Sequence, residues 1–225
     1  MNIKGFKINF LGDSITEGSG VDDIQNCRYD NRLAKMCKLA AVNNYGIGGS
    51  RIAHQLVPSL CPRYDLCFCG RAYNMDTTAD MVVVYGGVND YLHGDAPFGE
   101  IGDTVPSTFC GGVYFLMNML RETYKEKPII FMTPARCLFH GHIDDLYPSV
   151  HERKCVVGKA LIEYVNVIVE TAKQFNINVL NLYTDLGIDP HDPEQFEKYT
   201  ADGLHFNDQG HAILAQKLKD FIDAM

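Results

Sequence analysis

Short apolar runs recur along the chain, and each one stops at a residue that interrupts regular structure. The clearest is residues 81–85, a methionine, three valines and a tyrosine followed by Gly86. A continuous run of this length, rich in β-branched residues, is typical of a strand covered on both faces. We therefore predict a buried strand here. Four similar runs predict further strands at residues 8–11, 41–45, 128–133 and 177–182.

Between these runs, apolar residues recur at steps of three and four, which is the spacing of one helix face. This pattern predicts helices over residues 31–39, 107–124, 150–175 and 208–224, of which the third is the longest. Asn207 precedes the last helix and is a favoured residue for capping a helix N-terminus. Residues 52–80 contain two prolines and three cysteines, and we expect an irregular helical connection there.

Strands and helices alternate over the whole chain. Such alternation predicts a parallel sheet between two helical layers, joined by right-handed crossovers. The expected fold class is therefore α/β, three-layer α/β/α and flavodoxin-like, with a five-stranded parallel sheet. The length of 225 residues fits one catalytic domain over residues 1–225.

The composition narrows the range of partners. With 46% hydrophobic and 21% charged residues, the chain is ordinary for a soluble globular protein with a sizeable core. A formal net charge of -8 argues against binding nucleic acid or an anionic membrane, because both need a clustered positive field. No apolar stretch approaches the ~20 residues of a membrane span, and no signal peptide is recognisable at residues 1–7. We expect a cytoplasmic protein with a small-molecule partner, and the oligomeric state stays open.

The eight cysteines are scattered and include no Cys-x-x-Cys pair, so a structural zinc site is not expected. Free thiols are the preferred interpretation. Cys61, Cys67 and Cys69 form the one cluster in which a metal or a disulfide is an alternative. His140 and His142, followed by two aspartates, could also hold a metal, although a polar rim over a cleft is preferred. We expect neither a metal nor a cofactor.

Gly12, Asp13 and Ser14 follow the first predicted strand. Open parallel sheets bind ligands at the carboxyl ends of their strands, so a serine at this turn lies in a cleft beside a helix N-terminus. Two interpretations fit Ser14: a nucleophile, or a residue that only caps the helix. Asp13 is expected to fix the loop. It is also a candidate substrate contact, together with Tyr91 and His140.

Three further loops bring polar groups to the same edge of the predicted sheet. Gly49 follows the second strand, Asn89 follows the third, and Asp202 and His205 precede the last helix. A nucleophilic site needs a nucleophile, a base, an acid that orients the base, and donors for the oxyanion. Ser14, His205 and Asp202 can supply the first three. The donors can be the N–H groups of Ser14 and Gly49 and the side-chain amide of Asn89.

Four short blocks occur in order: Gly-Asp-Ser-Ile, Gly-Ile-Gly-Gly, Gly-Val-Asn-Asp and Asp-Gly-Leu-His. Together they make the chain similar to the SGNH hydrolase superfamily, the GDSL-type esterases and lipases. This resemblance implies that Ser14 is the nucleophile and that Asp202 and His205 are the acid and base. It also implies an oxyanion hole formed by Ser14, Gly49 and Asn89, with Gly48 as the less favoured register for the second block.

The resemblance implies a hydrolase that cleaves carboxylic esters through an acyl-enzyme. No long apolar lid segment is visible, so we expect a short acyl group such as acetyl, with a carbohydrate as one candidate alcohol. A lysophospholipase or thioesterase of the same family is the alternative. A flavodoxin-like module that binds a phosphate at residues 12–20 is an alternative of another class. Arg51 is expected to help shape the pocket, while His93 and His211 are expected to be surface or core residues.

Overall fold

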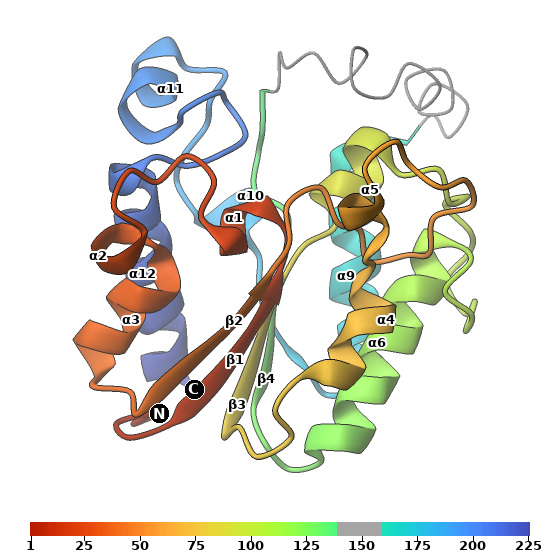
Figure 1. Cartoon of the computed structure of the whole chain (residues 1–225), viewed down its shortest axis with the longest axis horizontal. Helices are drawn as coiled ribbons and strands as arrows, with labels where there is room; N and C mark the ends of the chain where they lie inside the picture. Colours follow the sequence, from red (N-terminus) through yellow and green to blue (C-terminus); the bar gives the residue numbers. More distant parts are fainter. Residues whose placement is uncertain (139–158) are drawn as a thin grey trace.

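The computed structural model describes residues 1–138 and 159–225. Five parallel strands form one sheet in the order β2-β1-β3-β4-β5, with helices on both faces (Figure 1). This arrangement confirms the predicted three-layer class, and the strand order 2-1-3-4-5 is the flavodoxin-like one. The strands are β1 (Lys7–Gly12), β2 (Ala41–Gly46), β3 (Met81–Tyr85), β4 (Ile129–Met132) and β5 (Asn178–Leu180).

The three strands β2, β1 and β3 end level with one another. Gly12, the last residue of β1, pairs with Gly46 on β2 and with Tyr85 on β3. The loops that follow these strands therefore leave the sheet side by side. Segments that are far apart in the sequence meet at this carboxyl edge.

Helices bury opposite faces of the sheet. One layer contains α3 (Tyr29–Cys37) and α12 (Asp208–Ala224), and the other contains α4 (Phe68–Arg71), α6 (Phe109–Tyr124) and α9 (Leu161–Gln174) (Figure 1). The valines of β3 alternate between the two cores: Val83 packs in the first, Val82 and Val84 in the second. The other α-helices of the described residues are short: α1 (Ser14–Glu17), α2 (Ile24–Cys27), α5 (Val88–His93), α10 (Leu182–Asp185) and α11 (Pro193–Tyr199).

Residues 52–80 form short helical pieces, as the prolines and cysteines predicted. They are the 3-10 helices η1 (Pro62–Asp65) and η2 (Ala72–Asn74), with α4 between them. Arg71 at the end of α4 donates to the carbonyl oxygen of Gly12 and to Ser50 Oγ, each at 2.7 Å, and also to the carbonyl oxygen of Tyr45. This partly buried guanidinium therefore holds the ends of β1 and β2 together.

Several predicted elements differ from the structure in their bounds, and two of the differences have a clear local cause. The helix predicted over residues 150–175 begins at Leu161, because Ala160 is extended (φ -80°, ψ 155°) and donates its N–H to Glu163 at 2.8 Å. Residues 150–158 lie outside the described residues. With 14 residues, α9 is also shorter than α12, which has 17. The fifth strand ends at Leu180, because Leu182 already begins α10.

No helix in the described part of the chain is long and apolar enough to cross a membrane. Cys61, Cys67 and Cys69 are free thiols, so the cluster forms no disulfide. Residues 1–138 and 159–225 contain no group of three His, Cys, Asp or Glu side chains placed to hold a metal ion. The alternative metal set at His140 and His142 lies outside these residues.

Candidate active site

Ser14 lies at the turn from β1 into α1, at the carboxyl edge of the sheet. It is the first residue of α1, and the preceding Asp13 caps the helix by accepting a hydrogen bond from the N–H of Ile15 at 3.0 Å. The capping role that was one interpretation of Ser14 therefore belongs to Asp13. Ser14 is 7% exposed, so little of the residue is open to solvent.

His205 contacts Ser14 and Asp202 through its two ring nitrogens. Its Nε2 lies 2.8 Å from Ser14 Oγ, and its Nδ1 lies 2.6 Å from Asp202 Oδ2. Because an ionised carboxylate only accepts, Nδ1 carries the ring proton and Nε2 accepts the hydroxyl hydrogen of Ser14. Burial alone would raise the pKa of Asp202, but the hydrogen bond and charge of His205 hold that pKa below its usual value. This arrangement can take a proton from Ser14.

The loop before α12 holds the acid and the histidine in this geometry. Asp202 Oδ1 accepts the N–H groups of Leu204 at 2.9 Å and His205 at 2.7 Å, so the loop folds around its own carboxylate. Gly203 has φ +86°, and a Cβ there would lie 1.9 Å from the carbonyl oxygen of Leu138. The loop is also tied to Leu138, whose N–H donates to Gly203 at 2.9 Å. A three-residue spacing of acid and base therefore depends on this glycine.

The structure separates the two glycines of the second block. The N–H of Gly48 donates to Glu17 Oε2 at 2.7 Å, and the Glu17 carboxylate is also paired with Arg63. Within the described residues, the N–H of Gly49 makes no hydrogen bond. Gly49 has φ +72°, and a Cβ there would lie 2.6 Å from the ring of Tyr64. Gly49 is therefore the glycine whose donor is free for a ligand.

Asn89 lies in the first turn of α5, after β3. Its side chain is buried, with 4% of the residue exposed. Its Nδ2 donates to the carbonyl oxygen of Ser50 at 3.0 Å, and its Oδ1 lies 3.0 Å from His93 Nε2. An amide nitrogen carries two hydrogens. One is used on Ser50, and the second is available at the carboxyl edge.

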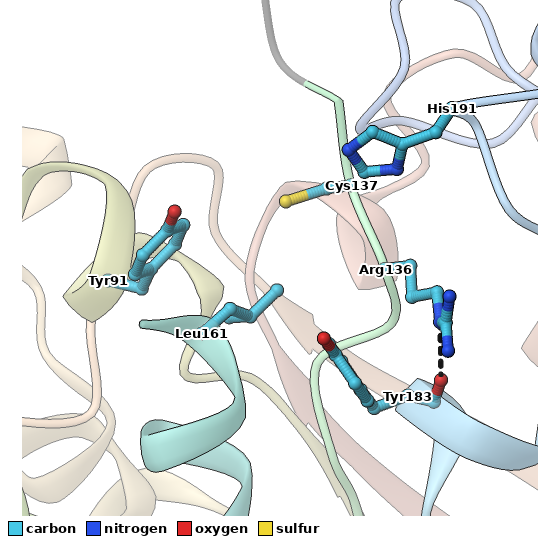
Figure 2. A pocket seen from close by; sticks show the side chains of 6 residues that line it. All are labelled: Tyr91, Arg136, Cys137, Leu161, Tyr183 and His191. Carbon is cyan, nitrogen blue, oxygen red and sulfur yellow. Dashed lines mark hydrogen bonds between the residues drawn. The ribbon is translucent and has the colours of Figure 1, made fainter. Parts of the chain in front are cut away.

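A cavity of about 240 Å³ is lined by residues from five parts of the chain (Figure 2). Figure 2 shows Tyr91 and Leu161 on one side and Arg136 with Tyr183 on the other, where Arg136 Nε donates to the Tyr183 carbonyl oxygen at 3.3 Å. Cys137 and His191 complete the lining. Tyr91 was expected here. Arg136 and Tyr183 were missed, although both follow predicted strands at the carboxyl edge.

A second, small cavity of about 10 Å³, room for about one water molecule, adjoins the first through Arg136 and Cys137. Three residues of its lining are chain neighbours of Ser14, Asn89 and His205. The lining consists of Ile15, Tyr85, Val88, Ala135, Arg136, Cys137 and Leu204. The small cavity therefore shares part of its lining with the larger one and touches residues next in the chain to Ser14 and His205.

The other residues that the sequence analysis singled out do not line the cavities within the described part of the chain. Asp13 is fully buried beneath the turn, which gives no support to a contact with substrate. His140 lies outside the described residues. Arg51 is 2% exposed and contacts His93 rather than the cavity lining. His211 is a core residue, as expected, and its Nδ1 accepts the N–H of Tyr29 at 3.2 Å.

The Asp13→Asn substitution should make folding less sensitive to pH. Burial raises the pKa of Asp13 from 3.8 to about 6, opposed by the hydrogen bond from Ile15. The native state therefore keeps this proton to a higher pH than the unfolded chain. Its stabilising contribution is complete below pH 3.8 and is lost as the pH rises through about 6. Asparagine keeps the helix cap and does not titrate.

Urea unfolding of both proteins at several pH values between 4 and 7 tests this expectation. The free energy of unfolding of Asp13→Asn, relative to wild type, should rise by roughly 1–3 kcal/mol over that range. A difference that stays constant with pH would contradict the assignment of the buried carboxyl.

The geometry does not favour a phosphate site at residues 12–20. The turn before α1 is occupied by the carboxylate of Asp13, which accepts the N–H of Ile15. A phosphate would have to lie beside this carboxylate. It would also have to compete with it for the N-terminus of a helix of only four residues. The Ser14 hydroxyl, by contrast, already has a partner that fits a nucleophile, because it contacts His205 Nε2.

A parallel sheet with serine, histidine and aspartate in contact at its carboxyl edge is typical of serine hydrolases. The chain belongs to the GDSL-like Lipase/Acylhydrolase family, whose model matches residues 10–213. It is therefore a carboxylic ester hydrolase, as the four sequence blocks predicted. No curated protein matches the sequence significantly.

Solved structures share the fold over almost the whole chain. A protein from Lactobacillus plantarum is 28% identical, with a TM-score of 0.82 over 99% of this chain and 98% of that one. A possible lipase from Chitinophaga pinensis is 22% identical, with a TM-score of 0.68 over 97% and 98%. An acetyl xylan esterase is 21% identical, with a TM-score of 0.60 over 95% and 98%. At the last two identities, the similarity shows the fold alone.

Proposed function

We propose that this ester hydrolase is a serine esterase in which Ser14 is the nucleophile, His205 the base and Asp202 the acid that orients it. The observation that carries the proposal is the position of His205, whose two ring nitrogens contact Ser14 Oγ at 2.8 Å and Asp202 at 2.6 Å. These are hydrogen-bond distances for a nucleophile and its base.

The reaction proceeds in two halves. Ser14 Oγ attacks the ester carbonyl carbon while His205 Nε2 takes its proton, and Asp202 stabilises the imidazolium that forms. The bond to the alcohol oxygen then breaks, and His205 returns the proton to that oxygen. A water molecule attacks the acyl-enzyme with His205 again as base. The carboxylic acid product then leaves, and His205 returns the proton to Ser14 Oγ.

The negative oxygen of the tetrahedral intermediate is stabilised by three donors: the N–H groups of Ser14 and Gly49, and Asn89 Nδ2. The free N–H of Gly49 and the second amide hydrogen of Asn89 support this assignment. Gly48 is the less suitable donor, because its N–H already donates to Glu17. Donors fixed before the reaction cost little reorganisation in the transition state.

The substrate we propose is a short acyl ester, acetyl first, on a polar alcohol such as a carbohydrate. The small cavity is lined largely by apolar side chains, including Ile15, Val88 and Leu204, and holds little more than one water molecule. The larger cavity offers Tyr91, Tyr183 and an arginine, which suit a hydroxyl-rich group.

A series of p-nitrophenyl esters from acetate to palmitate tests the acyl preference. We expect kcat/KM to be highest for acetate, because the small cavity has no room for a longer chain. Leu204→Ala enlarges that cavity and should raise the ratio of butyrate to acetate kcat/KM about tenfold, the scale of one or two methylene groups in an apolar pocket. Leu60→Ala, at a leucine that is 83% exposed, is the matched control.

A preference of the wild type for palmitate would overturn the short-acyl assignment and favour a lysophospholipase. Faster cleavage of acetyl thioesters than of acetyl esters would favour a thioesterase. Both outcomes leave the roles of Ser14 and His205 unchanged, so the substrate and the mechanism are tested separately.

A further inference from the structure

Two buried residues lie behind Asn89 and take no part in the reaction described above. Arg51 is 2% exposed and His93 is 5% exposed. The Nδ1 of His93 lies 2.7 Å from Arg51 NH1, and its Nε2 lies 3.0 Å from Asn89 Oδ1. We propose that His93, held by Arg51, is a positioning residue that fixes the amide of Asn89 for the oxyanion. This inference rests on the proposed role of Asn89.

Donor and acceptor chemistry fixes the tautomer of His93. A guanidinium has five N–H donors and no acceptor. Nδ1 of His93 must therefore accept the hydrogen bond from Arg51, and the ring proton is on Nε2. The Nε2–H then donates to Asn89 Oδ1. Arg51 thus sets the tautomer of the His93 imidazole, and this tautomer requires the amide oxygen of Asn89 to face His93.

The contact at the other end of the amide requires the same orientation. The carbonyl oxygen of Ser50 can only accept, and it lies 3.0 Å from Asn89 Nδ2. A flipped amide would place its oxygen against the Ser50 oxygen and its NH₂ against the Nε2–H of His93. The flip would also turn the amide oxygen toward the negative charge that forms in the reaction. The two contacts therefore exclude the orientation that would oppose catalysis.

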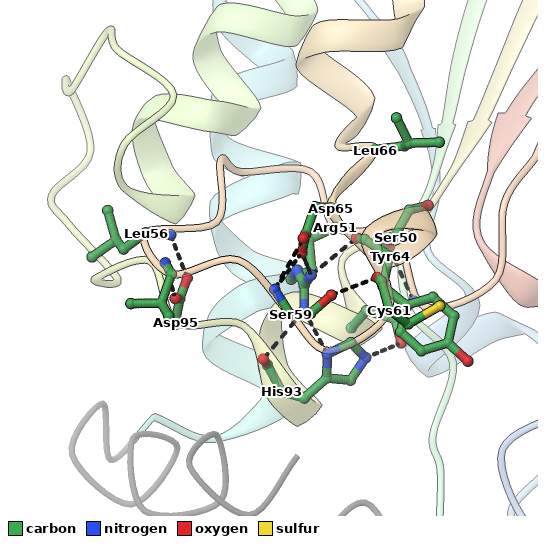
Figure 3. Close-up of polar contacts among 12 residues, drawn as sticks. Ser50, Arg51, Leu56, Ser59, Cys61, Tyr64, Asp65, Leu66, His93 and Asp95 are labelled. Carbon is green, nitrogen blue, oxygen red and sulfur yellow. Dashed lines mark hydrogen bonds and ion pairs between the residues drawn. The ribbon is translucent and has the colours of Figure 1, made fainter. Parts of the chain in front are cut away.

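Arg51 is held in turn by the segment that follows the second block. Its NH2 donates to the carbonyl oxygen of Tyr64 at 2.9 Å and pairs with Asp65 Oδ1 at 3.2 Å. Asp65 also accepts the N–H of Ser59 at 2.9 Å. Figure 3 shows Arg51 between this segment and His93, with Ser59 and Asp65 beside it. This irregular segment thus anchors the arginine.

Two substitutions of His93 distinguish positioning from packing. Glutamine can place an N–H near the position of Nε2, whereas leucine fills the space without a donor. We expect His93→Leu to lower kcat for p-nitrophenyl acetate about 10–100-fold, with KM within about twofold of wild type. His93→Gln should stay within about threefold of the wild-type kcat. His211→Leu, which removes another fully buried histidine, controls for lost packing and should lower the melting temperature without this loss of kcat.

A double-mutant cycle with Asn89→Ala gives the decisive readout. If His93 acts through Asn89, His93→Leu should lower kcat less than twofold in the Asn89→Ala background, because there is no amide left to position. If His93→Leu does not fold, Arg51→Met replaces it in the same cycle. That substitution removes the donor that fixes the tautomer.

The failures of the two proposals are distinguishable. Equal losses in His93→Leu and His93→Gln would overturn the positioning role. So would a full additional loss on top of Asn89→Ala, because either result indicates a structural residue. If Asn89→Ala is slow but His93→Leu works at the wild-type rate, only the positioning proposal fails. If Asn89→Ala itself retains the wild-type kcat, the oxyanion assignment fails and the positioning role fails with it.

Discussion

Ser14→Ala is expected to lower kcat for p-nitrophenyl acetate by about 10⁴-fold or more, because no acyl-enzyme can form. The residual rate should be set by the oxyanion donors and by binding alone. Steady-state kinetics on purified protein measures this loss. Circular dichroism should show an unchanged fold, since alanine is a good first residue for α1 and the helix cap belongs to Asp13.

Labelling with a fluorophosphonate probe, followed by peptide mapping, provides the control. The wild type and Ser19→Ala should be labelled on the peptide that contains Ser14, and Ser14→Ala should not be labelled. A labelled Ser19 or Ser50, or a Ser14→Ala variant with the wild-type rate, would contradict the assignment of the nucleophile.

Asn89→Ala should lower kcat about 10²–10³-fold, which corresponds to ~2.7–4 kcal/mol of transition-state stabilisation from one oxyanion donor. KM should stay within about threefold of wild type, because the charge on the carbonyl oxygen develops only after attack. Asn89→Asp should be at least as slow, since a carboxylate accepts where the reaction needs a donor.

Kinetics with p-nitrophenyl acetate distinguishes these cases, and thermal unfolding shows whether each variant folds. A variant that raises KM and leaves kcat unchanged would show that Asn89 binds the ground state. In that case the oxyanion would be stabilised by the N–H groups of Ser14 and Gly49.

Much of the fold could be predicted because buried parallel strands leave a strong local signal. The three valines of β3 predicted both the strand and its two covered faces, and the structure places Val83 and its neighbours in opposite cores. The start of α9 could not be predicted. Ala160 is an unusual residue at an N-cap, and the cap depends on Glu163 reaching back to its N–H.

The candidate site could be predicted as far as strand ends determine it. Ser14, Gly49 and Asn89 each follow a strand at the carboxyl edge of the sheet, and Ser14 contacts His205 there. The contacts of Arg51 and His93 could not be predicted, because they depend on the path of residues 52–66 across the end of α5. Arg136 and Tyr183 also follow strands, so their position at the carboxyl edge was predictable. Their strands, however, are not followed by a sequence block of the family.

The loop that holds Asp202 and His205 comes late in the chain, directly before α12. A ribosome completes Ser14, Gly49 and Asn89 long before it reaches this loop. With these roles, a growing chain carries its nucleophile and its oxyanion donors but no base. On the proposed roles, a chain that lacks the Asp202–His205 loop is therefore expected to have no esterase activity. On the proposed roles, biosynthesis adds the base only after all five strands of the sheet have been made.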